Sequence, residues 1–153
     1  LIESISYAPV SYGKGWKLML HLTTQNFEIC RMNHWQFPSD TPAKTRPEHT
    51  TLAVVMFYAL WCGKCAMMRP VIEDLEKNYQ KKYSGSICFF EVETSESALL
   101  AAQYQTGLLP AFLIFKDREL IATMQGMIPP KELDSRLQEL LTVHLRTQST
   151  ENL

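Results

Sequence analysis

Two cysteines separated by two residues are the feature of this sequence that could do chemistry. Cys62 and Cys65 stand in the run Trp61-Cys62-Gly63-Lys64-Cys65. Two thiols at this spacing can exchange a disulfide with a partner and then close on themselves. The pair follows the apolar run Leu52 to Leu60 and precedes a segment with helical periodicity. We therefore expect Cys62 at a helix N-terminus, where a thiolate is stabilised.

The chemistry predicted for this pair is nucleophilic attack by sulfur. A free cysteine titrates near ~8.5, so at neutral pH only a small fraction is the reactive thiolate. Unpaired amides at the helix start and the ammonium group of Lys64 should both favour the anion at Cys62. Cys62 would attack a partner disulfide, and Cys65, one turn along the helix, would resolve the mixed disulfide. Gly63 would leave the approach open to a bulky polypeptide.

A static disulfide, a pair of buried thiols and a zinc site are the alternatives for these cysteines. A zinc site needs further ligands at ligand-like spacing. The remaining cysteines and histidines are scattered, at Cys30, Cys88, His21, His34, His49 and His144. We therefore expect no metal, and no cofactor beyond a redox-active disulfide between Cys62 and Cys65.

Length and composition favour one globular domain. The 153 residues are 46% hydrophobic, which is enough to fill a single core. A net charge of -1 gives no electrostatic reason to expect nucleic acid. The longest apolar run, Leu52 to Cys62, is too short to span a bilayer at ~1.5 Å per residue, so we expect no direct membrane contact. Because the chain begins at Leu1 without a methionine, we expect it to be a processed product or an excised piece of a longer protein.

Hydrophobic periodicity predicts the elements that must position the cysteine pair. Strands are expected at Lys17 to Leu22, Leu52 to Leu60, Ser86 to Val92, Ala111 to Phe115 and Leu120 to Met124. Helices are expected from Thr23 or Thr24 through Met32, and over Cys62 to Tyr79, Glu96 to Tyr104 and Pro130 to Leu145. This order predicts an α/β fold in which a central mixed sheet carries helices on both faces.

The domain expected from these elements spans residues 17–145. Residues 1–16 lack clear periodicity and are expected to be an N-terminal extension, and residues 146–153 a C-terminal tail. Prolines and polar residues fill 31–50, which predicts a long surface loop inserted into the domain.

With these elements in place, the sequence resembles the thioredoxin family over about residues 17–145. The strand followed by Trp-Cys-Gly-x-Cys matches, and Pro70 lies where family members carry a proline that kinks the active-site helix. Pro110 falls where the family keeps a cis proline facing the disulfide, and Gly126 where it has a glycine beside the substrate groove. The resemblance implies a thioredoxin fold and a thiol–disulfide oxidoreductase acting on cysteine-containing client proteins.

The resemblance also implies a groove for extended peptides around the thiols. Its members would be Trp61, Leu109, Pro110, Gly126 and Met127. If Pro110 is cis, the backbone of Leu109 can pair with a bound chain, and Met127 adds a contact that adapts to varied sequences.

The run Leu22-Thr23-Thr24-Gln25-Asn26-Phe27 resembles the opening of protein disulfide isomerase domains. It implies a domain of a longer, multi-domain protein with an isomerase-like role in the endoplasmic reticulum lumen or another secretory compartment. A cytoplasmic thioredoxin is the alternative.

Three positions depart from the family or compensate for a departure. Lys64 replaces an uncharged proline or a histidine, which predicts a reduction potential above that of a typical thioredoxin unless solvent screens the charge. Met56 stands where the family buries an acid that relays the proton of the second cysteine, which predicts slow turnover. Glu91, on the adjacent strand, is the candidate replacement relay; the alternative is a solvated strand residue. The competing function is therefore a protein-binding module of a larger assembly with weak or slow redox activity.

Overall fold

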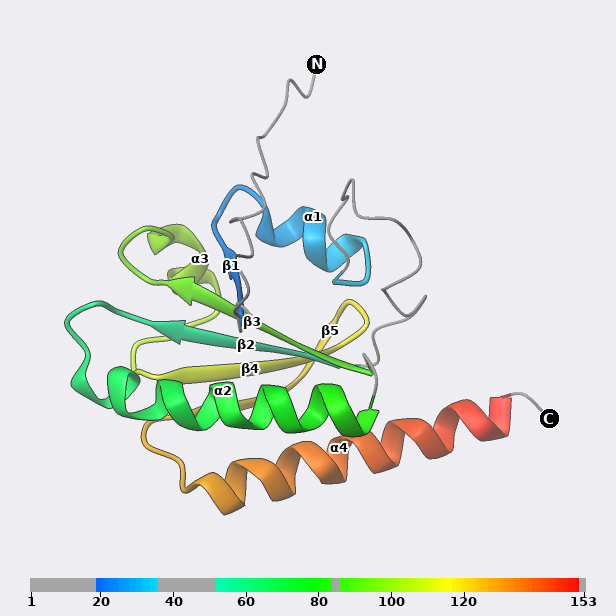
Figure 1. The fold of residues 1–153 in the computed structure, drawn as a ribbon. Coiled ribbons are helices and arrows are strands. Elements are labelled where there is room, and N and C mark those ends of the chain that lie inside the picture. Colours follow the sequence, from blue (N-terminus) through cyan, green and yellow to red (C-terminus); the bar gives the residue numbers. More distant parts are fainter. Residues whose placement is uncertain (1–18, 36–51, 84–85, 152–153) are drawn as a thin grey trace, which may run out of the picture.

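The computed structural model describes residues 19–35, 52–83 and 86–151. The expected N-terminal extension and most of the expected loop insertion lie outside these ranges. The elements are β1 (Leu20–Leu22), α1 (Phe27–Met32), β2 (Leu52–Tyr58), α2 (Gly63–Tyr83), β3 (Ile87–Glu93), α3 (Ala98–Gln103), β4 (Ala111–Lys116), β5 (Glu119–Gln125) and α4 (Pro130–Glu151) (Figure 1). This order confirms the alternation predicted from the sequence.

The strands form one mixed sheet in the order β1-β3-β2-β4-β5. β1, β3 and β2 run parallel, while β4 is antiparallel to both β2 and β5. The central strand β2 is buried except at its last residue, Tyr58. A strand covered on both faces must be apolar on both, which explains the unbroken hydrophobic run that begins at Leu52.

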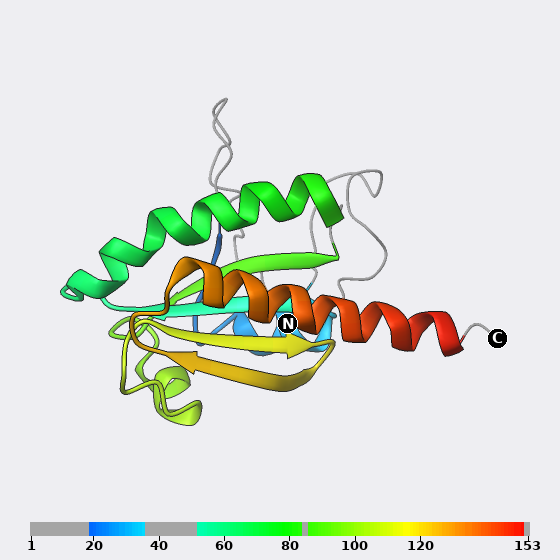
Figure 2. The same ribbon diagram turned by 90° about the horizontal axis from the view of Figure 1, so that it is seen from below.

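Helices cover both faces of the sheet, as the sequence predicts. α2 and α4 lie on one face, and α1 and α3 on the other (Figures 1 and 2). The Tyr79 hydroxyl of α2 donates a hydrogen bond to the Asp134 carbonyl of α4 at 3.1 Å. None of the helices in the described ranges combines the length and apolar composition that a bilayer span requires.

α4 is longer than expected and runs through Glu151, into the segment predicted to be a tail. Residues 146–151 contain no proline or glycine, so the sequence there has no helix stop signal. The helix buries a stripe of leucines against the sheet, at Leu133, Leu137 and Leu141.

Trp35 corrects the start of the predicted surface loop. Its side chain is only 2% exposed and its ring packs against those of Phe27, Phe90 and Phe115. The indole N–H donates to the Asp117 carbonyl at 2.5 Å. The described beginning of the 31–50 segment is therefore core, because burying a large indole with its N–H bonded outweighs the polar character of its neighbours.

Glu76 is a buried carboxyl on α2. It accepts the Met19 backbone N–H at 2.8 Å, just before β1, and the Gln80 amide at 3.4 Å. Burial is the main cause that raises its pKa to about 8, outweighing the Met19 bond, which lowers it. At neutral pH the folded protein therefore keeps this carboxyl protonated, at a cost in stability.

Glu76→Gln should raise the free energy of unfolding by about 2 kcal/mol near pH 7.5. The folded pKa lies above the unfolded value of 4.5, so the penalty is absent below that value and grows as pH rises toward 8. The gain from the substitution should follow the same course in urea unfolding. Asp74→Asn, on the exposed side of the same helix, is the control. A gain that does not change between pH 4.5 and 8 would contradict this account.

Candidate functional site: the Cys62–Cys65 disulfide

The site begins where β2 ends. The chain turns after Tyr58, the Cys62 N–H donates to the Ala59 carbonyl at 3.1 Å, and α2 begins at Gly63. This confirms that Cys62 lies at a helix N-terminus. Backbone N–H groups at that position favour a negative charge on its sulfur.

Cys62 and Cys65 form a disulfide, with their Cα atoms 5.3 Å apart. The Cys65 N–H donates to the Cys62 sulfur at 3.2 Å, a bond that would also stabilise a thiolate there. Cys62 is 8% exposed and Cys65 3%. The two sulfurs are therefore unequal, and Cys62 combines the greater access with the better-stabilised anion.

The sheet register brings two distant loops to the same end. Phe57 pairs with Ala111, and Ala111 pairs with Gln125. The residues just before β4 and just after β5 therefore lie beside the end of β2. The Leu109–Pro110 bond is cis, as the resemblance implied. Gly126 has a φ of +85° and donates its N–H to the Pro110 carbonyl at 2.8 Å.

Large apolar side chains surround this end of the sheet. Trp61 is 77% exposed, and Met127 is exposed as the groove prediction requires, whereas Leu109 is buried. Leu60 and Leu108 are also exposed, beyond the groove members expected from the sequence. Leu108 lies against Gly126, since a Cβ built on that glycine would be 3.7 Å from the leucine Cδ2. The sequence signal that could identify Leu108 is its position two residues before Pro110.

Gly63 and Lys64 face solvent at the start of α2. A Cβ at Gly63 would meet no heavy atom within 4 Å outside its chain neighbours and its own helix backbone, so this side of Cys62 is open. Lys64 is exposed, and solvent screens its charge. The effect of Lys64 on the reduction potential stays a prediction.

Met56 is fully buried in the middle of the sheet. It pairs in register with Glu91 of β3 and with Phe112 of β4. The position that the family resemblance assigned to a buried acid is thus filled by an apolar side chain, and the carboxylate beside it belongs to Glu91 of the neighbouring strand.

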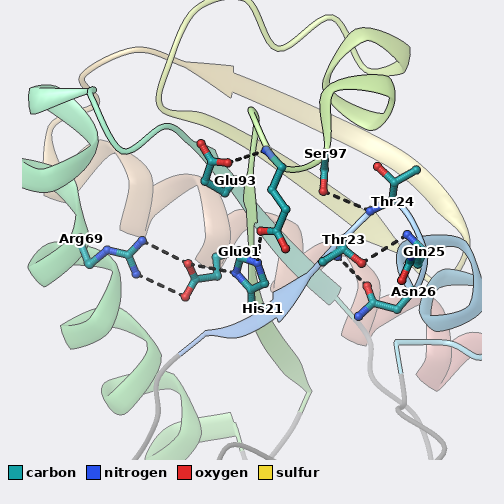
Figure 3. Close-up of polar contacts among 10 residues, drawn as sticks. His21, Thr23, Thr24, Gln25, Asn26, Arg69, Glu91, Glu93 and Ser97 are labelled. Carbon is teal, nitrogen blue, oxygen red and sulfur yellow. Dashed lines mark hydrogen bonds and ion pairs between the residues drawn. The ribbon is translucent and has the colours of Figure 1, made fainter. Parts of the chain in front are cut away.

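Glu91 lies in an ion-pair network instead of a solvated strand position (Figure 3). Its carboxylate accepts from the Arg69 guanidinium at 3.3 and 3.5 Å, and the His21 ring lies 3.6 Å away. The Arg69 guanidinium also stacks over the Tyr58 ring at 4.8 Å. Burial alone would raise the pKa of Glu91, but His21, Tyr58 and Arg69 outweigh it and lower the pKa to about 2. A carboxylate that holds its proton so weakly is a poor base at neutral pH, which favours an ion-pair role over the proposed relay.

The sequence alone does not mark His21 or Arg69 as site residues. His21 Nε2 lies 2.7 Å from the Glu96 carboxylate, so this histidine sits between two acids from β3 and the turn before α3 (Figure 3). The Glu91 bond is the main cause that raises the pKa of His21. Neither residue has a telling spacing from Glu91, because His21 meets it through the pairing of β1 with β3 and Arg69 reaches it from α2.

The fold and this site together define a protein with a dithiol–disulfide pair at a helix N-terminus. Comparison with known proteins gives its family. The family model described as Thioredoxin matches residues 43–139, and the chain belongs to the thioredoxin family.

Several relatives are similar over the same region. Thioredoxin M-type, chloroplastic, of Spinacia oleracea is 34% identical over 89 residues, which are 58% of this chain and 47% of that protein. Thioredoxin 1 of Synechococcus elongatus is 32% identical over 61% of this chain and 84% of its own length. A thioredoxin-like protein of Synechocystis, slr1139, is 33% identical over 69% of this chain and 89% of its own. The chain thus spans about half the length of the spinach protein and most of the two cyanobacterial ones.

A solved structure has the same fold. The crystal structure of oxidised mitochondrial thioredoxin 3 from Saccharomyces cerevisiae aligns with a TM-score of 0.61 and 24% identity. The alignment covers 79% of this chain and 94% of that chain.

Proposed function

We propose that this protein is a thiol–disulfide oxidoreductase acting on cysteine-containing proteins. The observation that carries the proposal is the Cys62–Cys65 disulfide, which closes the first turn of α2 beside exposed apolar side chains. Its family relatives are thioredoxins, which supports the same reaction.

The reaction follows from the inequality of the two sulfurs. In the reduced protein, the Cys62 thiolate attacks one sulfur of a client disulfide, forms a mixed disulfide and releases the other client sulfur, which takes up a proton. The Cys65 thiol then loses its proton and attacks the Cys62 sulfur. The Cys62–Cys65 disulfide forms and the client leaves with both of its sulfurs reduced. Run backwards, the same steps transfer the disulfide to the client.

An isomerase-like role in a secretory compartment is a finer proposal. Its support is the resemblance of residues 22–27 to the opening of disulfide isomerase domains. The relatives named above are a chloroplastic thioredoxin and cyanobacterial proteins, which give the endoplasmic reticulum no support. The general exchange reaction, without a compartment, is therefore the stronger proposal.

A client-binding module with slow turnover is the second candidate. Met56 provides no base in the buried layer of β2, and Glu91 is held as an ion-paired carboxylate. Both observations favour slow proton removal from Cys65. The exposed Leu60 and Trp61 offer apolar surface that could hold a partner in the meantime.

Equilibration with glutathione redox buffers tests the main proposal. Alkylation of free thiols, followed by peptide mapping, would separate Cys62 and Cys65 from Cys30 and Cys88. We expect one two-electron transition, whose potential can be compared with the thioredoxin value of about −270 mV. Reduced protein should also cleave the disulfides of a model substrate such as insulin. A pair that exchanges with glutathione but never with a protein disulfide would contradict the oxidoreductase and favour the binding module.

A further inference from the structure

Glu93 is a buried carboxylate whose two oxygens differ. It is the last residue of β3 and is 6% exposed. Oε2 accepts the Glu96 N–H at 2.6 Å (Figure 3). Oε1 is buried and has no hydrogen-bond partner among the residues that the structure describes. An unsatisfied buried oxygen costs free energy, so its retention calls for an explanation.

The position of Glu93 connects it to the disulfide. Glu93 pairs in register with Tyr58, the last residue of β2, and the Thr94 N–H donates to the Tyr58 carbonyl at 2.8 Å. We call residues 59–62, which run from the end of β2 to Cys62, the redox loop. Glu93 therefore lies where β3 borders the beginning of the redox loop.

Backbone groups from two segments face this carboxylate. Burial raises the pKa of Glu93, but the N–H groups of Glu96, Ser95 and Leu60 outweigh burial and leave the pKa below its usual value. Glu96 and Ser95 belong to the turn before α3, whereas Leu60 lies in the redox loop, two residues before Cys62. Glu93 is thus a negative charge that is hydrogen-bonded to the turn before α3 and stabilised by the Leu60 N–H of the redox loop.

Unlike Glu91, Glu93 is stabilised by groups that carry no net charge. Glu91 pairs with the Arg69 guanidinium at 3.3 Å and lies 3.6 Å from the His21 ring. The groups that stabilise Glu93 are backbone N–H groups and the Ser95 hydroxyl, which carry no net charge. Among the residues that the structure describes, no cation forms an ion pair with Glu93, so its field reaches the redox loop without a partner charge.

We propose that Glu93 is a positioning residue for the redox loop and that its negative charge opposes the Cys62 thiolate. The proposal rests on the oxidoreductase function. Reduction of the disulfide takes up two electrons and creates a thiolate at Cys62. A nearby anion destabilises that thiolate, so Glu93 shifts the equilibrium toward the disulfide and makes the reduced protein a stronger reductant.

Glu93→Gln tests the proposal, because it keeps the shape of the side chain and the bond to Glu96 and removes the charge. At equilibrium with dithiothreitol, the ratio of reduced to oxidised protein should rise about threefold. The Cys62 thiolate should also form at lower pH, measured as the pH dependence of its alkylation rate. Glu96→Gln is the matched control: it removes the same charge three residues away from a more exposed site that faces His21, and should leave the equilibrium unchanged.

The outcomes separate this proposal from the function beneath it. No shift in Glu93→Gln, a shift toward the disulfide, or an equal shift in Glu96→Gln would overturn the role of Glu93. A wild-type disulfide that never exchanges with dithiothreitol would overturn the oxidoreductase function itself. If Glu93→Gln does not fold, Glu93→Asp and Glu93→Asn provide the same comparison, because they match in shape and differ in charge. The Asn variant should then be the more readily reduced of the two, and equality would overturn the proposal.

Discussion

Cys65→Ser is expected to accumulate mixed disulfides with client proteins, whereas Cys62→Ser is not. Cys62 lies at the N-terminus of α2 and receives the Cys65 N–H at 3.2 Å, so its thiolate is the better stabilised of the two. Without Cys65 the first attack still occurs, but no second sulfur releases the client. The covalent complex should therefore approach one client per protein molecule under limiting reductant, while turnover is lost in both variants.

Non-reducing electrophoresis after rapid acid quenching measures the trapped complex, and mass spectrometry identifies the cysteine that holds the client. Cys88→Ser is the matched control, because it removes a thiol from β3 and leaves the dithiol intact. Equal trapping by the two active-site variants would contradict the assignment of nucleophile and resolving thiol.

Trp35→Ala should lower the free energy of unfolding by about 3 to 5 kcal/mol. The indole is 2% exposed and packs with its ring centroid 4.7 Å from that of Phe115 and 5.4 Å from that of Phe90. Its removal leaves a cavity between α1 and the sheet and frees the Asp117 carbonyl from its hydrogen bond. Urea unfolding followed by far-ultraviolet circular dichroism would measure the loss.

Trp61→Ala is the matched control for that experiment. The same side chain is removed, but at a site that is 77% exposed, so the free energy of unfolding should change by no more than about 0.5 kcal/mol. Trp61→Ala should instead change the rate of disulfide exchange with client proteins. A similar loss of stability in the two variants would show that Trp35 is not the core residue described above.

The sequence predicts the dithiol and its position well because both depend on local signals. The apolar run that begins at Leu52 marks a buried strand, and the two cysteines mark the start of the helix that follows. Pro110 and Gly126 are found by their spacing within the family, and the structure brings their loops together beside the end of β2. Local periodicity also predicts each strand and helix that the structure describes, with ends that differ by a few residues.

The rest depends on contacts between segments that are far apart in the chain. The ion-pair network around Glu91 joins Arg69 of α2 to His21 of β1, and these side chains meet only because β1 pairs with β3 and α2 packs over the sheet (Figure 1). Trp35 belongs to a polar, proline-rich segment, yet it lies in the core because its large apolar ring is buried there. The environment of Glu93 is set by N–H groups of two turns, which have no signature in side-chain sequence.

The pairing of Phe57 with Ala111, and of Ala111 with Gln125, has a consequence for how mutations spread through this protein. The disulfide, the cis proline and Gly126 come from three segments, and the sheet register sets their positions relative to one another. A single-residue insertion in β4 would move Leu109 and Pro110 by one strand position and turn alternate side chains to the opposite face. An insertion or deletion in β4, far from either cysteine in the sequence, can therefore misalign Pro110 with the disulfide, whereas substitution of an exposed side chain such as Trp61 leaves the register intact.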